Sequence, residues 1–279
     1  MDLIQVNLGK CVQCGLCVDV CPSGAIGMGS EGPLTLSEKS CIACGHCVAV
    51  CPEAALDNVK ALLEKQVPAP ESPILDADSA ALFIRFRRSI RRYRPETVAR
   101  DKILRLLDIA RLAPSGGNSQ RVSFLVIDDE RTLRAISAAT IEWMEELIRQ
   151  GAPGAAYYAG TVKNHGARGR DEILRNAPCL IVAMAPKALG ARGRDNSHFA
   201  LAYAELYAPS LGLGTCWTGF MESCAISGYE PLLSLLSIPE KMQVTGGLMV
   251  GVPAIHYHRL PDRSPLQVTW ASEAQITMP

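Results

Sequence analysis

The sequence lacks the features that would carry it into a membrane or onto nucleic acid. Its longest uninterrupted apolar stretch, from Cys179 to Ala185, is far too short to cross a bilayer. The N-terminal residues lack the basic-then-apolar layout of a secretory leader. The 28 basic side chains are balanced by 28 acidic ones, so no net charge draws the chain to nucleic acid. We therefore expect a cytoplasmic protein with neither a membrane nor a nucleic-acid partner.

Aromatic residues are also scarce, at 5% of the chain, but hydrophobic residues together make up 48%. That content can fill a substantial core, so disorder is excluded. A length of 279 residues suits one small module and one domain of ordinary enzyme size.

Cysteine is abundant and unevenly placed. Eight of the eleven cysteines form two runs with the same spacing, C-x2-C-x2-C-x3-C-P, and every cysteine of the second run lies 30 positions after its counterpart. Gly15 and Gly45, and Ala25 and Ala55, repeat with the same shift. The pattern indicates an internal duplication of a compact unit, and packed cysteines favour metal ligation over disulfides.

This spacing is typical of two [4Fe–4S] clusters, in which three thiolates of one run and the last thiolate of the other hold each cluster. One cluster is expected on Cys11, Cys14, Cys17 and Cys51, and the other on Cys41, Cys44, Cys47 and Cys21. Structural zinc is the alternative, but zinc usually takes two separated C-x2-C pairs.

Closely spaced prolines between Gln66 and Pro73 predict an extended linker. We therefore expect a cluster-binding domain over residues 1–62, a linker over 63–80 and a second domain over 81–279. Hydrophobic periodicity in the second domain predicts helices over 97–112 and 129–149 and strands over 122–127, 179–184 and 247–252. A further helix is expected to begin at Asn196 or Ser197 and to end at Gly212.

Three local patterns in the second domain could bind a ligand. The first is a cluster of arginines with a serine, running from Arg87 to Tyr93, whose guanidinium groups match phosphate oxygens; a solvated basic helix end is the simpler interpretation. The second, Ala113 to Gln120, could approach a flat ring closely but is by itself only a polar turn. The third, Leu211 to Phe220, follows a helix, so it is not a dinucleotide fingerprint.

Residues 1–60 resemble the bacterial 2[4Fe–4S] ferredoxins. In order and separation, the three later patterns resemble the FMN-dependent nitroreductase family over residues 82–270, with His258 to Arg263 supplying the basic pair usual near its C-terminus. The resemblance implies an α+β fold: a small ferredoxin-like domain followed by a nitroreductase-like domain with a central mixed sheet flanked by helices. It also implies a homodimer with FMN at the subunit interface, each site built by both chains.

The same resemblance implies roles for individual residues. Arg87, with its neighbour Arg88, and Ser89, Arg259 and Arg263 are expected at the FMN phosphate, and Arg91 near flavin N1 and the C2 carbonyl. Pro114, Ser115, Gly116 and Asn118 are expected along the ring, and the backbone N–H groups of Thr218 and Gly219 at N5 and O4. A fixed cation at Arg91 would stabilise the anionic reduced flavin. No side chain stands out as a catalytic acid.

These features predict an oxidoreductase in which the clusters relay single electrons from a low-potential donor, such as a ferredoxin-type protein, to FMN. FMN would then reduce a small organic acceptor such as a nitro compound, because clusters carry one electron whereas such acceptors take two. The alternatives are a flavin reductase, dehydrogenase or dehalogenase-like enzyme, and a non-enzymatic electron-transfer or redox-sensing module. A further alternative is DNA binding through the arginines of residues 85–94, which predicts salt-dependent retention of the protein on DNA.

A few residues fall outside these motifs. Cys179 and Cys216 are expected to pack in the core, although Cys216 lies beside the expected flavin and could touch substrate. His165 could donate a proton from the irregular, glycine-rich stretch 151–170, which we expect to form a lid. His256 and His258 alternate along an expected strand and lack further zinc ligands.

Overall fold

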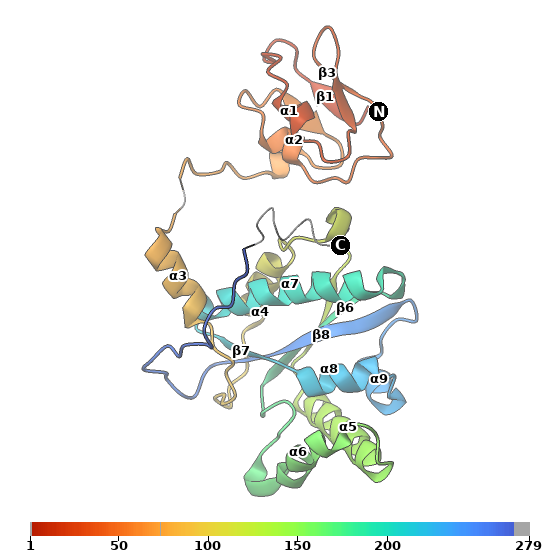
Figure 1. Cartoon of the computed structure of the whole chain (residues 1–279), viewed down its shortest axis with the longest axis vertical. Coiled ribbons are helices and arrows are strands. Elements are labelled where there is room, and N and C mark those ends of the chain that lie inside the picture. Colours follow the sequence, from red (N-terminus) through yellow and green to blue (C-terminus); the bar gives the residue numbers. More distant parts are fainter. Residues whose placement is uncertain (1, 73, 271–279) are drawn as a thin grey trace.

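The computed structural model describes residues 2–72 and 74–270, so residues 271–279 of the expected second domain lie outside the described part. Figure 1 shows a small N-terminal part, red to orange, joined by an extended segment to a larger part. Each part has its own hydrophobic core. One centres on Leu3, Val48 and Leu56, and the other on residues that flank a four-stranded sheet.

The N-terminal part repeats one motif twice, as the 30-residue shift predicts. Strand β1 (Ile4–Val6) pairs antiparallel with β4 (Leu56–Asn58), and β2 (Ile26–Met28) pairs antiparallel with β3 (Pro33–Thr35). The single-turn helices α1 (Leu16–Asp19) and α2 (His46–Ala49) follow the first two cysteines of each run and contain the third. Their N-caps, Gly15 and Gly45, have φ values of +80° and +73°, a conformation that glycine adopts without strain.

The larger part is built on a sheet of order β5-β6-β8-β7 in which every neighbouring pair is antiparallel. Its strands are β5 (Ser123–Ile127), β6 (Cys179–Pro186), β7 (Gly214–Trp217) and β8 (Met242–Gly251). The mixed character expected of this sheet is limited, in the described residues, to one parallel bridge between Ser89 and Thr215.

Helices cover both faces of the sheet (Figure 1). Along β6, Leu180 and Val182 pack with α5, α8 and α9, whereas Cys179, Ile181 and Ala183 pack with α4 and α7. Successive side chains of a strand point to opposite faces, and a strand covered on both faces is apolar throughout. The helices are α3 (Ala77–Phe86), α4 (Arg100–Ala110), α5 (Glu130–Arg149), α6 (Ala159–Asn164), α7 (Ala191–Tyr207), α8 (Gly219–Ile226) and α9 (Glu230–Leu236).

Short 3-10 turns complete the described fold: η1 (Leu63–Lys65), η2 (Gly116–Asn118), η3 (Ala155–Tyr158), η4 (Ala167–Gly169), η5 (Lys187–Leu189) and η6 (Ala208–Leu211). The stretch 151–170 is therefore largely made of short helices, not irregular loop. Each of these helices is only one or two turns long. A helical period therefore cannot be recognised in the sequence among the glycines and paired tyrosines of this stretch.

The predicted start of one helix is wrong. Helix α7 begins at Ala191 after Gly190, and Asn196 and Ser197 are buried inside it rather than capping it. Helix α3 begins at Ala77, within the segment expected to be linker, because the Asp76 carboxylate accepts a hydrogen bond of 2.9 Å from the Ser79 N–H and caps the helix. Gly212 ends the α7–η6 segment at a φ of +70°, as predicted.

Candidate functional site

The structure brings together cysteines that are distant in sequence. A pocket that is partly open to solvent is lined by Cys11, Cys14, Cys17 and Cys51, with Met28 on its wall. The fourth cysteine of the second run thus joins the first three of the first run. Thiolate ligands around one cavity are the donor set that an iron–sulfur cluster requires.

Two cysteines of the second set, Cys41 and Cys47, lie beside Asn58. The Asn58 Nδ2 atom lies 3.7 Å from the Cys47 sulfur and 3.9 Å from the Cys41 sulfur. The last cysteine of each run accepts a backbone hydrogen bond: Ala25 N–H donates to the Cys21 sulfur at 3.3 Å, and Ala55 N–H to the Cys51 sulfur at 3.2 Å. Such N–H donors stabilise negative charge on sulfur, so these residues fit [4Fe–4S] clusters.

Burial and hydrogen bonding act in opposite directions on these thiols. Burial raises the pKa of Cys17 and that of Cys47, and the Asn58 amide opposes the rise at Cys47. At Cys21, burial also acts to raise the pKa, but hydrogen bonds from the Ser23 and Ala25 amides outweigh it and the pKa falls. The fold therefore supports the thiolate form most strongly where N–H groups point at sulfur.

In the larger part, the segment that contains Arg87, Ser89 and Arg91 lies along strand β7. Ile90 N–H donates to the Thr215 carbonyl at 2.8 Å. Close approach is possible because residue 214 is glycine: a Cβ there would lie 2.5 Å from Ile90 Cγ1. The buried Ile90 anchors the segment, and its neighbours in sequence point away from the core.

The arginines of this segment have different surroundings. Arg87 forms an ion pair of 3.1 Å with the buried Glu205, which also accepts a 2.9 Å hydrogen bond from Trp217 Nε1. The Arg88 guanidinium lies 4.9 Å from the centre of the Tyr257 ring, and its buried Nε has no hydrogen-bond partner among the described residues. Arg259 and Arg263 are exposed.

A second cavity, partly open to solvent, adjoins this segment. Arg91 and Gly219 both line it. The other lining residues are Tyr157, Tyr158, Glu172, Ile173, Arg175, Cys216, Trp217, Phe220, Ser223 and Met249. A concave wall that combines aromatic residues with a few charged groups is typical of a site for a flat organic ligand. Because Cys216 is buried and burial raises the pKa of its thiol, it lines this cavity as an unreactive thiol.

Thr218 stands at the start of α8, beside the same cavity. Its N–H donates to the Gly247 carbonyl at 3.1 Å, so that amide is engaged with the sheet. Its buried hydroxyl has no partner among the described residues. A Cβ at Gly247 would lie 2.6 Å from this hydroxyl, which explains the glycine in the strand.

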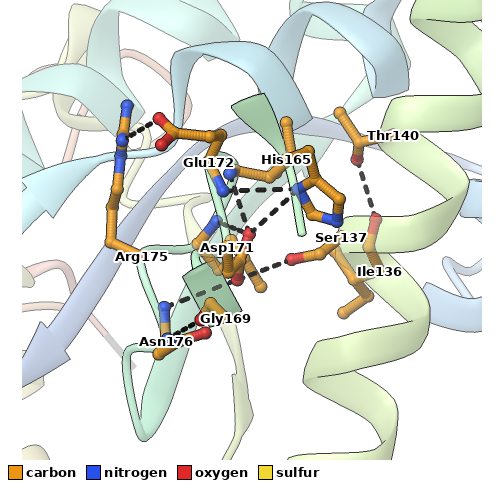
Figure 2. Close-up of polar contacts among 11 residues, drawn as sticks. Ile136, Ser137, Thr140, His165, Gly169, Asp171, Glu172, Arg175 and Asn176 are labelled. Atoms are coloured by element: carbon orange, nitrogen blue, oxygen red, sulfur yellow. Dashed lines mark hydrogen bonds and ion pairs between the residues drawn. The ribbon is translucent and has the colours of Figure 1, made fainter. Parts of the chain in front are cut away.

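Asp171 holds the loop that forms the charged side of the cavity (Figure 2). Its carboxylate accepts hydrogen bonds from the Ser137 hydroxyl at 2.9 Å and from the Ile173 N–H at 2.8 Å. The loop that follows places Glu172 and Arg175, which form an ion pair, on the cavity wall. Motif comparison does not single out these residues, because only the folded loop brings them beside Arg91.

His165 does not line this cavity, as far as the described residues define it. Its Nδ1 atom accepts a 3.3 Å hydrogen bond from the Glu172 N–H, so it supports the loop in Figure 2. The neighbouring stretch does supply Tyr157 and Tyr158 to the cavity wall. His256 and His258 lie beyond the end of β8 and not along a strand as expected.

The turn from Pro114 to Ser119 lies elsewhere. Gly116 N–H donates to Asn196 Oδ1 on helix α7 at 3.0 Å. Asn118 Nδ2 donates to the carbonyls of Ile42 and Ala43, at 2.9 and 3.0 Å. The turn therefore contacts the loop between Cys41 and Cys44, and among the described residues neither Ser115 nor Asn118 lines the cavity with Arg91.

No helix in the described ranges combines the length and the apolar character needed to cross a membrane.

Comparison with known proteins identifies both parts. The model of the nitroreductase family matches residues 84–252, and the model of the 4Fe-4S dicluster domain matches residues 10–57. The chain is 30% identical over 203 residues to an NADH dehydrogenase from Thermus thermophilus, covering 68% of this chain and 94% of that protein.

Solved structures of the same fold include an FMN-dependent nitroreductase from Clostridium difficile, with 25% identity, a TM-score of 0.50 and coverage of 68% of this chain and 98% of that one. Another is a nitroreductase with bound FMN from Desulfitobacterium hafniense. It has 19% identity, a TM-score of 0.56 and coverage of 69% and 97%.

Proposed function

Because this chain belongs to the nitroreductase family and carries a 4Fe-4S dicluster domain at its N-terminal end, we propose that it is an FMN-dependent oxidoreductase fed by its own clusters. The clusters would take electrons from a low-potential donor such as a ferredoxin-type protein, and the acceptor would be a small organic molecule such as a nitro compound. The hydrogen bonds from Asn118 to Ile42 and Ala43 carry the proposal. They join a cluster-binding loop to the turn that the family resemblance assigns to the flavin.

The segment that reaches the second cavity at Arg91 carries side chains that fit FMN. By resemblance, Arg87, Ser89, Arg259 and Arg263 hold its phosphate, which guanidinium groups bind in two-point fashion. The unpartnered, buried Arg88 Nε lies in the same segment. When bound, FMN accepts electrons one or two at a time and supplies them to the acceptor as a pair.

The chain's own groups would orient the ligands. The Arg91 guanidinium lies on the cavity wall, where a fixed cation stabilises negative charge on a reduced ring. Tyr157 and Phe220, whose ring centres lie 6.1 Å apart, offer aromatic surface on which a flat acceptor can stack. Protons come from solvent through the open side of the cavity.

We further propose a homodimer. The 115–118 turn does not line the cavity of its own chain, and the family resemblance implies that both chains build each flavin site. A second copy would supply this turn to complete the site. We also keep the division into domains over 1–62 and 81–279, with the linker over 63–80, as part of the proposal. Thiolate ligands and a reduced donor both suit the reducing cytoplasm.

The test is anaerobic stopped-flow reduction by a dithionite-reduced ferredoxin, following flavin absorbance. Ligand variants Cys14→Ser and Cys44→Ser should slow flavin reduction by at least tenfold, because each interrupts the cluster set it belongs to. The matched control is Cys224→Ser, which changes a buried cysteine outside the two runs. Equal flavin reduction in all three variants would refute the relay.

A second candidate is an NAD(P)H-dependent flavin enzyme in which the clusters are not on the path. The names of the relatives favour it, since one is an NADH dehydrogenase and another an FMN reductase [NAD(P)H] from Bacillus subtilis. Rapid bleaching of the flavin by NADH in the Cys44→Ser variant would support this candidate.

A further inference from the structure

The internal repeat allows the two cysteine sets to be compared position by position. Each residue of the first half has a counterpart 30 positions later, and the Ala25 and Ala55 N–H bonds to sulfur differ by only 0.1 Å. Strands β2 and β4 are counterparts, and their last residues are Met28 and Asn58. A difference at this position therefore distinguishes one cluster site from the other.

Asn58 is placed to act on sulfur. Its side chain is buried, and its Oδ1 accepts a 2.9 Å hydrogen bond from the Lys60 N–H. That bond fixes the amide so that Nδ2 faces the sulfurs of Cys47 and Cys41, at 3.7 and 3.9 Å. Met28, on the wall of the other cavity, is exposed, and its side chain has no N–H group to donate.

Hydrogen bonds to cysteine sulfur favour the more negative, reduced form of a cluster and so raise its reduction potential. Burial acts in the opposite direction, and the second loop is the less exposed of the two. Most ligand sulfurs of both sets remain partly exposed, however, so burial separates the sets only modestly. The Asn58 amide, in contrast, reaches two of the four sulfurs of a single set.

The two loops also face different surroundings. Asn118 of the larger part donates to Ile42 and Ala43, and a Cβ at Gly45 would lie 3.1 Å from Gln66 Nε2, so the second loop is covered by its own chain. In the first loop, the counterpart of Ile42 is Val12, which is 63% exposed. The first loop is thus open to a separate protein.

We propose that the two cluster sites have a fixed order. The Cys11–Cys17 loop receives each electron, and the site that contains Asn58 has the higher potential and passes the electron on across the Asn118 contact. This order rests on the proposed function. Each electron that passes through the two clusters comes from the one-electron oxidation of a low-potential donor. Two such transfers supply the two electrons that the acceptor takes, and the protons come from solvent.

The test uses the full chain, purified without oxygen, in a mediated potentiometric titration followed by low-temperature EPR of the reduced clusters. Asn58→Leu removes the amide and keeps the number and branching of the side-chain heavy atoms, and Met28→Leu is the matched control at the equivalent position. In the wild-type chain we expect two one-electron waves. Asn58→Leu should shift only the upper wave, downward by about tenfold in the equilibrium constant, or about 59 mV, while Met28→Leu leaves both waves in place.

A downward shift of the lower wave, or no shift with iron and sulfide retained, would overturn the assignment of Asn58. If Asn58→Leu loses its cluster, Asn58→Ala decides. Alanine is neutral and has no amide, so the same upper wave should fall.

The direction of transfer is tested separately with the neutral variant Asn118→Leu in the presence of excess FMN. Without the Asn118 amide donor, the clusters should still be reduced rapidly, and both cluster potentials should be unchanged. Flavin reduction should then be roughly tenfold slower, because small displacements have large effects on rate. An unchanged rate would refute the assignment of the second loop as the point of departure. In the wild-type chain, clusters that become reduced while the flavin stays oxidised would refute the proposed function, and the wave shifts would still report on Asn58.

Discussion

Replacement of Gly214 by alanine is expected to disturb both stability and flavin binding. A Cβ at this position would lie 2.5 Å from Ile90 Cγ1 and 2.9 Å from both Ile90 Cβ and Pro253 Cγ. Ordinary contacts of a Cβ begin at 3.4 Å, so the segment around Ile90 must move by about 0.9 Å. Ile90 is buried, and both its side chain and its N–H bond to Thr215 resist that movement.

Overpacking of this kind costs about 1–3 kcal/mol. For a domain of this size, each kcal/mol lowers the melting temperature by about 2–4 °C. Displacement of Ser89 and Arg91, which flank Ile90, should also weaken FMN binding, by about tenfold for each 1.4 kcal/mol lost from the complex.

Thermal unfolding followed by circular dichroism measures the first effect, and quenching of FMN fluorescence measures the second. Gly160→Ala is the matched control, because a Cβ there meets nothing within 4 Å and the residue lies in helix α6. If Gly214→Ala has the melting temperature and FMN affinity of the control, the close approach of the 89–91 segment to β7 is not what positions the flavin ligands.

Two other substitutions and the chemistry of two buried thiols test separate parts of the structure. Asp171→Ala removes the acceptor that holds the loop in Figure 2, so thermal unfolding should show a loss of about 1–3 kcal/mol; an unaltered melting temperature would contradict that role. Tyr157→Ala removes exposed aromatic surface from the cavity and should raise KM for a nitroaromatic acceptor several-fold while donor-driven flavin reduction is unchanged; an unchanged KM would place the acceptor elsewhere. Burial raises the pKa of Cys179 and of Cys224 to about 12, so iodoacetamide should not label either thiol in the folded chain at pH 8. Because both thiols ionise near pH 9 once unfolded, the free energy of unfolding should fall as pH rises above about 9, and a pH-independent value would refute their burial.

The expected flavin residues divide into two groups in one chain. Arg91 and Gly219 share the cavity beside β7, whereas Asn118 reaches the Cys41–Cys44 loop. If a second copy completes each site, one turn contacts both a cluster loop and a flavin. In that arrangement, docking of the cluster domain and formation of the dimer interface would both depend on this turn. Motif comparison alone did not suggest this role for Asn118.

Much of this protein could be read from its sequence because short-range chemistry determines it. The spacing of Cys11, Cys14 and Cys17, repeated 30 residues later, specifies a cluster loop without reference to the rest of the fold. Helix α5 and strand β6 were predicted from hydrophobic period and length, since each buries a face long enough to show its pattern. The nitroreductase motifs likewise identified the family of the larger part.

Tertiary structure alone decided which distant groups meet. Asn58 could have been noticed as the counterpart of Met28, but only the β1–β4 pairing and the Lys60 bond aim its amide at two sulfurs. The start of α7 was misplaced because Asn196, which resembles a cap, is buried in the helix and holds the Gly116 turn. Long-range contacts of this kind depend on how elements pack, and no local pattern of residues encodes them.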